Sequence, residues 1–224
     1  VGSAHPLAAG DGAGPRPHNA IYVIDDRGAL VDRYDKRFCA GDEVDGELAL
    51  YSPGDHPVVV DIDGVRCGLM ICHEYRYPEL YRDYKARGVD LIFHSFHAAG
   101  LSEATYAAME AEVGADHFAD NWGRTLPAIT MPATLVATAA ANHLWISAAN
   151  SSAPRACWPG LLVRPDGVIV GRLEDERAGL LIREIDTEAP LYESTRLWRG
   201  RAMAGRLHSG ELVDAPRSGD RRSF

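Results

Sequence analysis

The chain has 224 residues, a formal net charge of −9 and 46% hydrophobic residues, which is ordinary for a globular protein long enough to bury a core. The acidic balance and the lack of a basic stripe exclude the usual features of nucleic-acid binding. Four cysteines in a chain of this length do not form a disulfide scaffold, so we expect a reduced, cytoplasmic setting. The longest weakly polar run, residues 131–150, contains Thr, Asn, His and Ser, so no membrane span is expected.

The first 100 residues predict two hairpins and a helix. Residues 1–19 are rich in Gly, Ala and Pro and are expected to be irregular. Strands are predicted at 20–24 and 29–34, with an acidic loop following at 39–54. A second hairpin pairs 57–62 with 65–72 around the turn Asp63-Gly64. A helix is predicted over 78–87, with Gly88 ending it, and a buried strand over 89–93.

The remainder alternates helices and strands. Ser102 is expected to cap one helix, and a second helix is predicted over 132–141. Further strands are predicted at 144–149, 161–163, 168–170 and 179–185, while the tail, 199–224, is expected to be extended or disordered. Hairpins mixed with helices indicate a single layered α/β domain over residues 1–224, in which the sheet is not purely parallel.

Cys72 lies where the predicted strand 65–72 ends and a helix is about to begin at Pro78-Glu79. At such a junction a thiol is partly exposed and faces backbone N–H groups, which favours the nucleophilic thiolate. The alternative is that Cys72 is a small buried hydrophobic residue, as most free cysteines are.

The segment Gly68-x-x-Ile71-Cys72-x-Glu74-x-Arg76-Tyr77-Pro78-Glu79 resembles the nucleophile signature of the nitrilase, or carbon–nitrogen hydrolase, superfamily. The resemblance extends over roughly residues 19–187. It implies a four-layer α-β-β-α sandwich and a cysteine that attacks a carbon bound to nitrogen. It also implies a homodimer or higher oligomer, and a reaction that requires no cofactor.

The same resemblance implies roles for three more residues. Lys36, in Tyr34-Asp35-Lys36-Arg37, would stabilise the developing charge. Glu47, shortly before Tyr51-Ser52-Pro53-Gly54, would hold Lys36, with Glu43 as the alternative. The backbone N–H of His73 would contribute to the oxyanion site. By residue type alone, Lys36 and Glu47 would be taken for solvated surface charges.

One part of the family pattern is not found. The family's general base is a Glu well upstream of the lysine, and residues 1–35 contain no Glu. Because the chain also begins without Met, we expect an N-terminally truncated form that hydrolyses little or nothing. Active-site titration beside an upstream-extended form would test this expectation, and full turnover by the short form would refute it.

The sequence therefore predicts hydrolysis of a non-peptide carbon–nitrogen bond in a small amide, carbamoyl or nitrile substrate, through a thioester on Cys72. The alternative is a non-catalytic relative that binds a ligand or serves as a subunit. A metal site at His94, His97 and His143 is a weaker hypothesis, because no Cys pair has zinc spacing. Ser95 lacks the Gly-x-Ser-x-Gly elbow of serine hydrolases.

Overall fold

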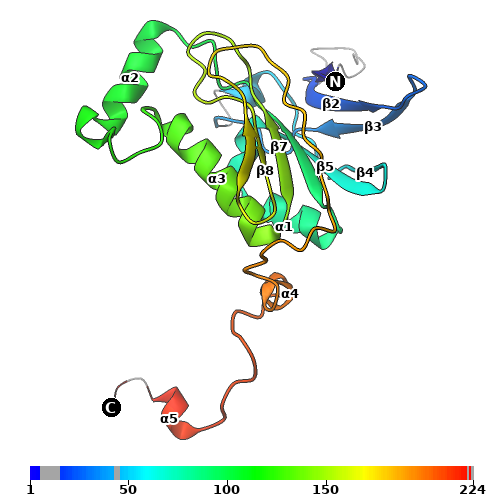
Figure 1. The fold of residues 1–224 in the computed structure, drawn as a ribbon, viewed down its shortest axis with the longest axis vertical. Helices are drawn as coiled ribbons and strands as arrows, with labels where there is room; N and C mark the ends of the chain where they lie inside the picture. Colours follow the sequence, from blue (N-terminus) through cyan, green and yellow to red (C-terminus); the bar gives the residue numbers. More distant parts are fainter. Residues whose placement is uncertain (6–15, 43–45, 221, 223–224) are drawn as a thin grey trace.

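The computed structural model describes residues 1–5, 16–42, 46–220 and 222, and the alternative carboxylate Glu43 lies outside them. The fold is built on two sheets (Figure 1). The smaller has the order β1-β2-β3, formed by Gly2–His5, His18–Ile24 and Leu30–Asp35. The larger has the order β4-β5-β6-β7-β8-β9, formed by Val59–Ile62, Val65–Ile71, Leu91–Ser95, Trp145–Ala149, Leu161–Val163 and Ile169–Arg172.

The hairpin that leads into β5 forms as the sequence predicts. Asp63 and Gly64 both have positive φ, at 49° and 84°, which is the backbone geometry of the two-residue turns that match strand twist. The turn sets the register, with Ile62 opposite Val65. Strands β5, β6 and β7 then run parallel, while their outer neighbours are antiparallel. The sheet is therefore mixed, as predicted.

Helices α1 (Pro78–Ala86) and α3 (Leu126–Asn142) cover one face of the larger sheet (Figure 1). Gly68 on β5 allows α1 to approach closely, because a Cβ atom there would lie 2.8 Å from the ring of Tyr84. The Tyr84 hydroxyl donates a hydrogen bond to the carbonyl of Leu69 at 2.5 Å. This helix therefore fixes the strand that carries the predicted nucleophile.

The other face of the larger sheet contacts the smaller sheet. Their shared core contains Tyr34 from β3 and Leu69 and Ile71 from β5. Sheet-on-sheet packing of this kind buries alternating inward side chains. The layered α/β architecture is confirmed, and the described residues form three layers, helix on sheet on sheet. Leu30 and Val31 on the smaller sheet are exposed.

The prediction of a strand over 179–185 is wrong. This segment makes no ladder, but alternate side chains from it, Leu181 and Ile185, pack over the sheet beside Cys67. Leu180 and Ile182 between them are exposed. The apolar residues of this segment therefore belong to a stretch that lies across a sheet face without joining the sheet.

Three further boundaries differ from the sequence-based expectation. Residues 1–19 are not wholly irregular, because Gly2–His5 pairs with β2. Helix α3 begins six residues before Pro132, where Thr125 Oγ1 accepts the N–H of Ala128 at 3.3 Å. The tail contains two short helices, α4 (Arg199–Met203) and α5 (Pro216–Gly219), rather than extended chain alone.

The remaining elements are α2 (Glu103–Val113), which Ser102 caps as predicted, and three short 3₁₀ helices. These are η1 (Glu47–Ala49), η2 (Cys72–Arg76) and η3 (Ala115–His117). Within the described part of the chain, no helix is long and apolar enough to cross a membrane.

Candidate active site

Cys72 occupies the carboxyl end of β5 and begins η2. Its φ angle is +48°, a left-handed conformation that is uncommon for residues other than glycine and often occurs at functional sites. The side chain is half-buried and contacts both the helix-side core and the core between the sheets. Ligands of open α/β sheets bind outside the carboxyl ends of the strands, so this thiol lies where a substrate is expected.

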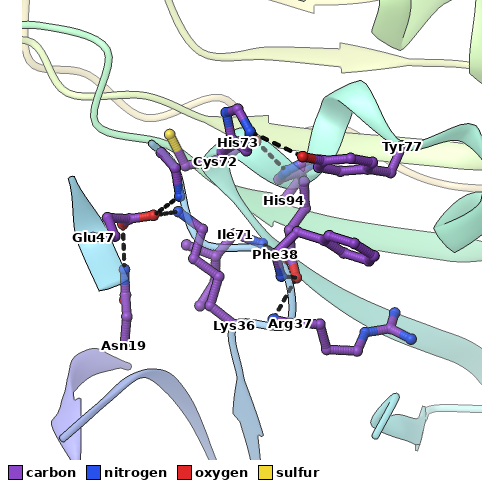
Figure 2. A network of polar contacts seen from close by, with 12 residues as sticks. Asn19, Lys36, Arg37, Phe38, Glu47, Ile71, Cys72, His73, Tyr77 and His94 are labelled. Carbon is purple, nitrogen blue, oxygen red and sulfur yellow. Dashed lines mark hydrogen bonds and ion pairs between the residues drawn. The ribbon is translucent and has the colours of Figure 1, made fainter. Parts of the chain in front are cut away.

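Lys36 and Glu47 form an ion pair beside Cys72 (Figure 2). Lys36 follows β3 directly and its side chain is 1% exposed, which is rare for lysine unless it is paired. Glu47 lies in η1 and accepts two further hydrogen bonds, from the Ala40 N–H at 2.5 Å and from Asn19 Nδ2 at 3.2 Å. The smaller sheet and its loops therefore hold the buried side chain of Lys36 in place.

The ion pair between Lys36 and Glu47 should make a pH-dependent contribution to the stability of the protein. Burial opposes ionisation of Glu47, but the bonds from Lys36, Ala40 and Asn19 prevail and lower its pKa below 4.5. A carboxylate whose pKa is lowered by folding stabilises the protein above its unfolded pKa, and this contribution is lost as pH falls through the folded pKa. The stability difference between the wild type and Glu47→Gln should therefore be largest at neutral pH and shrink below pH 4.5.

Urea denaturation of both proteins at several pH values measures this difference. Glu112→Gln, on the exposed face of α2, is the matched control. A difference that stayed constant from neutral to acidic pH would contradict the assignment of Glu47 as the charged partner of Lys36.

Glu74 connects the two strand ends. Its buried carboxylate accepts hydrogen bonds from the Tyr34 hydroxyl at 2.6 Å and from the backbone N–H of Arg37 at 2.7 Å on one oxygen. The other oxygen accepts from the N–H of Ile71 at 2.7 Å. Burial raises the pKa of Glu74 and these bonds oppose the rise. One carboxylate thus ties the residue after Lys36 to the residue before Cys72.

The sequence-based prediction missed this role of Glu74. The signal was present in the fixed spacing Cys-x-Glu of the motif. Buried glutamates are almost always paired, so a Glu that directly follows a buried strand indicates hydrogen-bond donors nearby. Two of its partners, Tyr34 and Arg37, lie 40 and 37 positions earlier in the chain, and no local pattern identifies them.

His73 is half-buried, and its Nε2 lies 3.2 Å from the Tyr77 hydroxyl. The Tyr77 ring in turn stacks on Phe38 at 4.2 Å between centroids. Burial, followed by the charges of Arg76 and Lys36, lowers the pKa of His73. Its imidazole is therefore held beside Tyr77, while its backbone N–H belongs to the first turn of η2, where N–H groups have no partner within the helix.

The histidines proposed as metal ligands do not assemble. Over the described ranges, no group of three His, Cys, Asp or Glu side chains is placed to hold a metal ion. His94 is instead buried and bonds to the protein, with Nε2 3.2 Å from the Cys72 carbonyl oxygen.

A cavity of about 310 Å³ lies between the α2–α3 segment and the strands β8 and β9. Its walls include Tyr106, Trp122 and Trp158. Trp158 meets Phe96 edge-to-face at 4.9 Å, and Phe96 stacks on His94 at 4.1 Å. The cavity wall is therefore linked through two ring contacts to the imidazole that touches Cys72, although Cys72 does not line the cavity.

A partly buried thiol at a strand end and a buried, ion-paired lysine are groups that thiol-dependent acyl transfer can use. The family model of the carbon-nitrogen hydrolases matches residues 3–189. The chain belongs to the carbon-nitrogen hydrolase family, which confirms the resemblance drawn from the Cys72 motif.

Comparison with curated proteins gives partial matches. The chloroplastic omega-amidase of Arabidopsis thaliana is 26% identical over 227 residues, covering 97% of this chain and 53% of that protein. A hydrolase of Mycobacterium tuberculosis is 51% identical over 46 residues, covering 20% of this chain and 16% of that protein. A 2-oxoglutaramate amidase of Paenarthrobacter nicotinovorans is 38% identical over 77 residues, covering 33% of this chain and 26% of that protein. The chain thus spans at most about half the length of these relatives.

Among solved structures, a mutant of the Nesterenkonia amidase from the nitrilase superfamily matches with a TM-score of 0.53 and 21% identity. The match covers 77% of this chain and 55% of that one. A mutant of the same amidase in complex with butyramide matches with a TM-score of 0.51 and 23% identity, covering 72% and 53%. At these identities the likeness shows the fold alone.

Proposed function

We propose that the site carries out the acylation half of amide hydrolysis, with Cys72 as the nucleophile and Lys36 as the electrophilic stabiliser. The observation that carries the proposal is the placement of a buried, paired lysine beside a half-exposed cysteine at a strand end. The substrate class is a small molecule with a carboxamide, carbamoyl or nitrile carbon, and carboxamides are favoured by the amidases among the relatives.

With a primary amide, the Cys72 sulfur attacks the carbonyl carbon, forming a C–S bond while the C=O electron pair moves to oxygen. Lys36 and the His73 N–H stabilise that oxyanion. A water molecule takes the thiol proton and returns it to the nitrogen as the oxyanion collapses and the C–N bond breaks, so the nitrogen leaves as ammonia. Water cleaves the resulting thioester, which releases the carboxylic acid and restores the thiol.

Hydrolysis of the thioester, the second half of the reaction, requires a base that activates water. In the family this base is a Glu upstream of the lysine, and residues 1–35 contain none. We therefore expect the 224-residue chain to accumulate an acyl-Cys72 species rather than to turn over. Covalent addition of the acetamide moiety of fluoroacetamide at the active site cysteine in a mutant of the Nesterenkonia amidase supports the proposal of a reactive thiol in this fold.

Intact-protein mass spectrometry with p-nitrophenyl acetate and with butyramide tests the proposal. We expect one acetyl group from the ester, located on Cys72 by peptide mapping, and none on Cys72→Ala. Cys67→Ala is the matched control, because burial raises the pKa of Cys67 to about 11 and leaves it unreactive. It should acylate like the wild type. Absence of any Cys72 adduct would overturn the proposal.

The alternative from the sequence, a non-catalytic relative that binds a ligand, predicts a different outcome. Butyramide would then bind without forming an adduct or releasing ammonia, and Cys72→Ala would bind it as well as the wild type. Isothermal titration calorimetry of both proteins separates the two functions.

A further inference from the structure

The Cys72 carbonyl accepts a hydrogen bond from a buried histidine that the proposed reaction does not use. His94, the fourth residue of β6, is 1% exposed, and its Nε2 lies 3.2 Å from that carbonyl oxygen. A carbonyl can only accept, so Nε2 carries the proton. The Tyr81 hydroxyl lies 3.2 Å from Nδ1 and donates to it, since the unprotonated ring nitrogen is an acceptor.

The environment keeps this imidazole neutral and fixed. Burial lowers the pKa of His94 to about 3. Phe96 stacks on the ring at 4.1 Å, and Tyr81 comes from α1 on the covered face of the sheet. The ring is therefore held from both sides, in one tautomer, with a single N–H directed at the backbone of the nucleophile.

The direction of this bond matters because of peptide geometry. A peptide unit is planar and trans, so its C=O and N–H point in opposite directions. The carbonyl of Cys72 and the N–H of His73 belong to the same unit. Drawing the carbonyl toward the buried imidazole therefore turns the His73 N–H away from the core, on the side where the half-exposed thiol would meet a substrate.

The bond also holds an unusual backbone. Cys72 has a φ of +48°, and such conformations persist only when surrounding contacts impose them. The Glu74 bond to the Ile71 N–H fixes the peptide before Cys72, and the His94 bond fixes the peptide after it. Together they determine the orientation of the nucleophile's two flanking peptides.

We propose that His94 is a positioning residue that orients the Cys72–His73 peptide so that the His73 N–H forms the oxyanion site, with Tyr81 fixing the tautomer that makes this possible. The inference rests on the proposed function, because it concerns the oxyanion formed when Cys72 attacks a carbonyl. In this role the His94 imidazole neither contacts the substrate nor transfers a proton.

Two reactions of the Cys72 thiol distinguish a role in orienting the oxyanion site from a general effect on the reactivity of the thiol. Acylation by p-nitrophenyl acetate passes through an oxyanion, whereas alkylation by iodoacetamide displaces iodide without forming one. In His94→Phe, which keeps an aromatic ring against Phe96, acylation should slow by about 10- to 100-fold. Alkylation should change by no more than about twofold, because the thiol itself is untouched. His94→Gln, which retains an N–H donor, should recover most of the acylation rate.

Three outcomes would overturn the inference. The first is equal acylation by the wild type and His94→Phe, and the second is a parallel fall in acylation and alkylation. The third comes from the wild type alone: ¹⁵N NMR of the imidazole should show the Nε2–H tautomer, and an Nδ1–H tautomer would rule out the bond to Cys72 even if His94→Phe failed to fold. Wild-type protein that alkylates but never acylates would instead overturn the proposed function, and this inference with it.

Discussion

Lys36→Met should slow acylation of Cys72 by about 10²- to 10³-fold, because removal of one fixed group that stabilises an oxyanion has an effect of that size in other acyl-transfer enzymes. Lys36 is one of only two lysines in the chain, and its side chain is almost fully buried against Glu47. In this low-dielectric setting the ammonium charge acts on the oxyanion with little screening by solvent. Methionine has a similar length and no charge, so it removes the charge with little change in volume.

The burst of p-nitrophenolate released from p-nitrophenyl acetate measures the effect. Lys85→Met is the matched control, since Lys85 is also largely buried and ion-paired, with Asp90, but lies in the last turn of α1. That variant should acylate at close to the wild-type rate. A Lys36→Met rate within about threefold of the wild type would contradict the electrostatic role.

Glu74→Ala should lower the free energy of unfolding by about 4 kcal/mol, because each buried donor left without an acceptor costs about 1–3 kcal/mol. The donors concerned are the Tyr34 hydroxyl and the backbone N–H groups of Arg37 and Ile71. A loss of this size is a large share of the 5–15 kcal/mol that stabilises typical domains. Both strand ends of the site would lose their common anchor, so acylation should fall as well.

Urea denaturation followed by circular dichroism measures the loss. Glu74→Gln should fall between the wild type and Ala, because its amide oxygen can still accept from Tyr34 while its NH₂ group would face the Ile71 donor. Glu79→Ala, an exposed glutamate in the first turn of α1, should cost less than about 1 kcal/mol. Equal stabilities of Glu74→Ala and Glu79→Ala would contradict the connecting role.

The hairpins and the position of Cys72 were predictable because their causes are local. Asp63-Gly64 fixes a turn, and Ser102 caps a helix, through contacts within a few residues. The helix predicted over 132–141 begins earlier, at Leu126, because the hydroxyl of Thr125 caps it and Pro132 lies inside it. The short strand Gly2–His5 has no apolar alternation, and only its partner β2 makes it a strand.

The site was predictable only in part. The resemblance led to Lys36, Glu47 and Cys72, and the structure brings these three together. The Cys-x-Glu spacing of the motif drew attention to Glu74 but did not identify its partners, and nothing in the sequence indicated the role of His94. Tyr34 and Arg37 lie 40 and 37 positions before Glu74, and Cys72 lies 22 positions before His94. Such distant pairs become neighbours only once the chain has folded.

Cys72 and Lys36 belong to different sheets, and this has a consequence for how the proposed chemistry can be tuned. Cys72 is carried by β5 and Lys36 by the end of β3, so the gap between sulfur and nitrogen depends on how one layer slides over the other. Apolar residues at that boundary, such as Leu69, act as spacers for the reacting groups. Laboratory evolution of a faster or differently selective catalyst could therefore change these apolar contacts between the sheets and leave every polar group of the candidate active site unchanged.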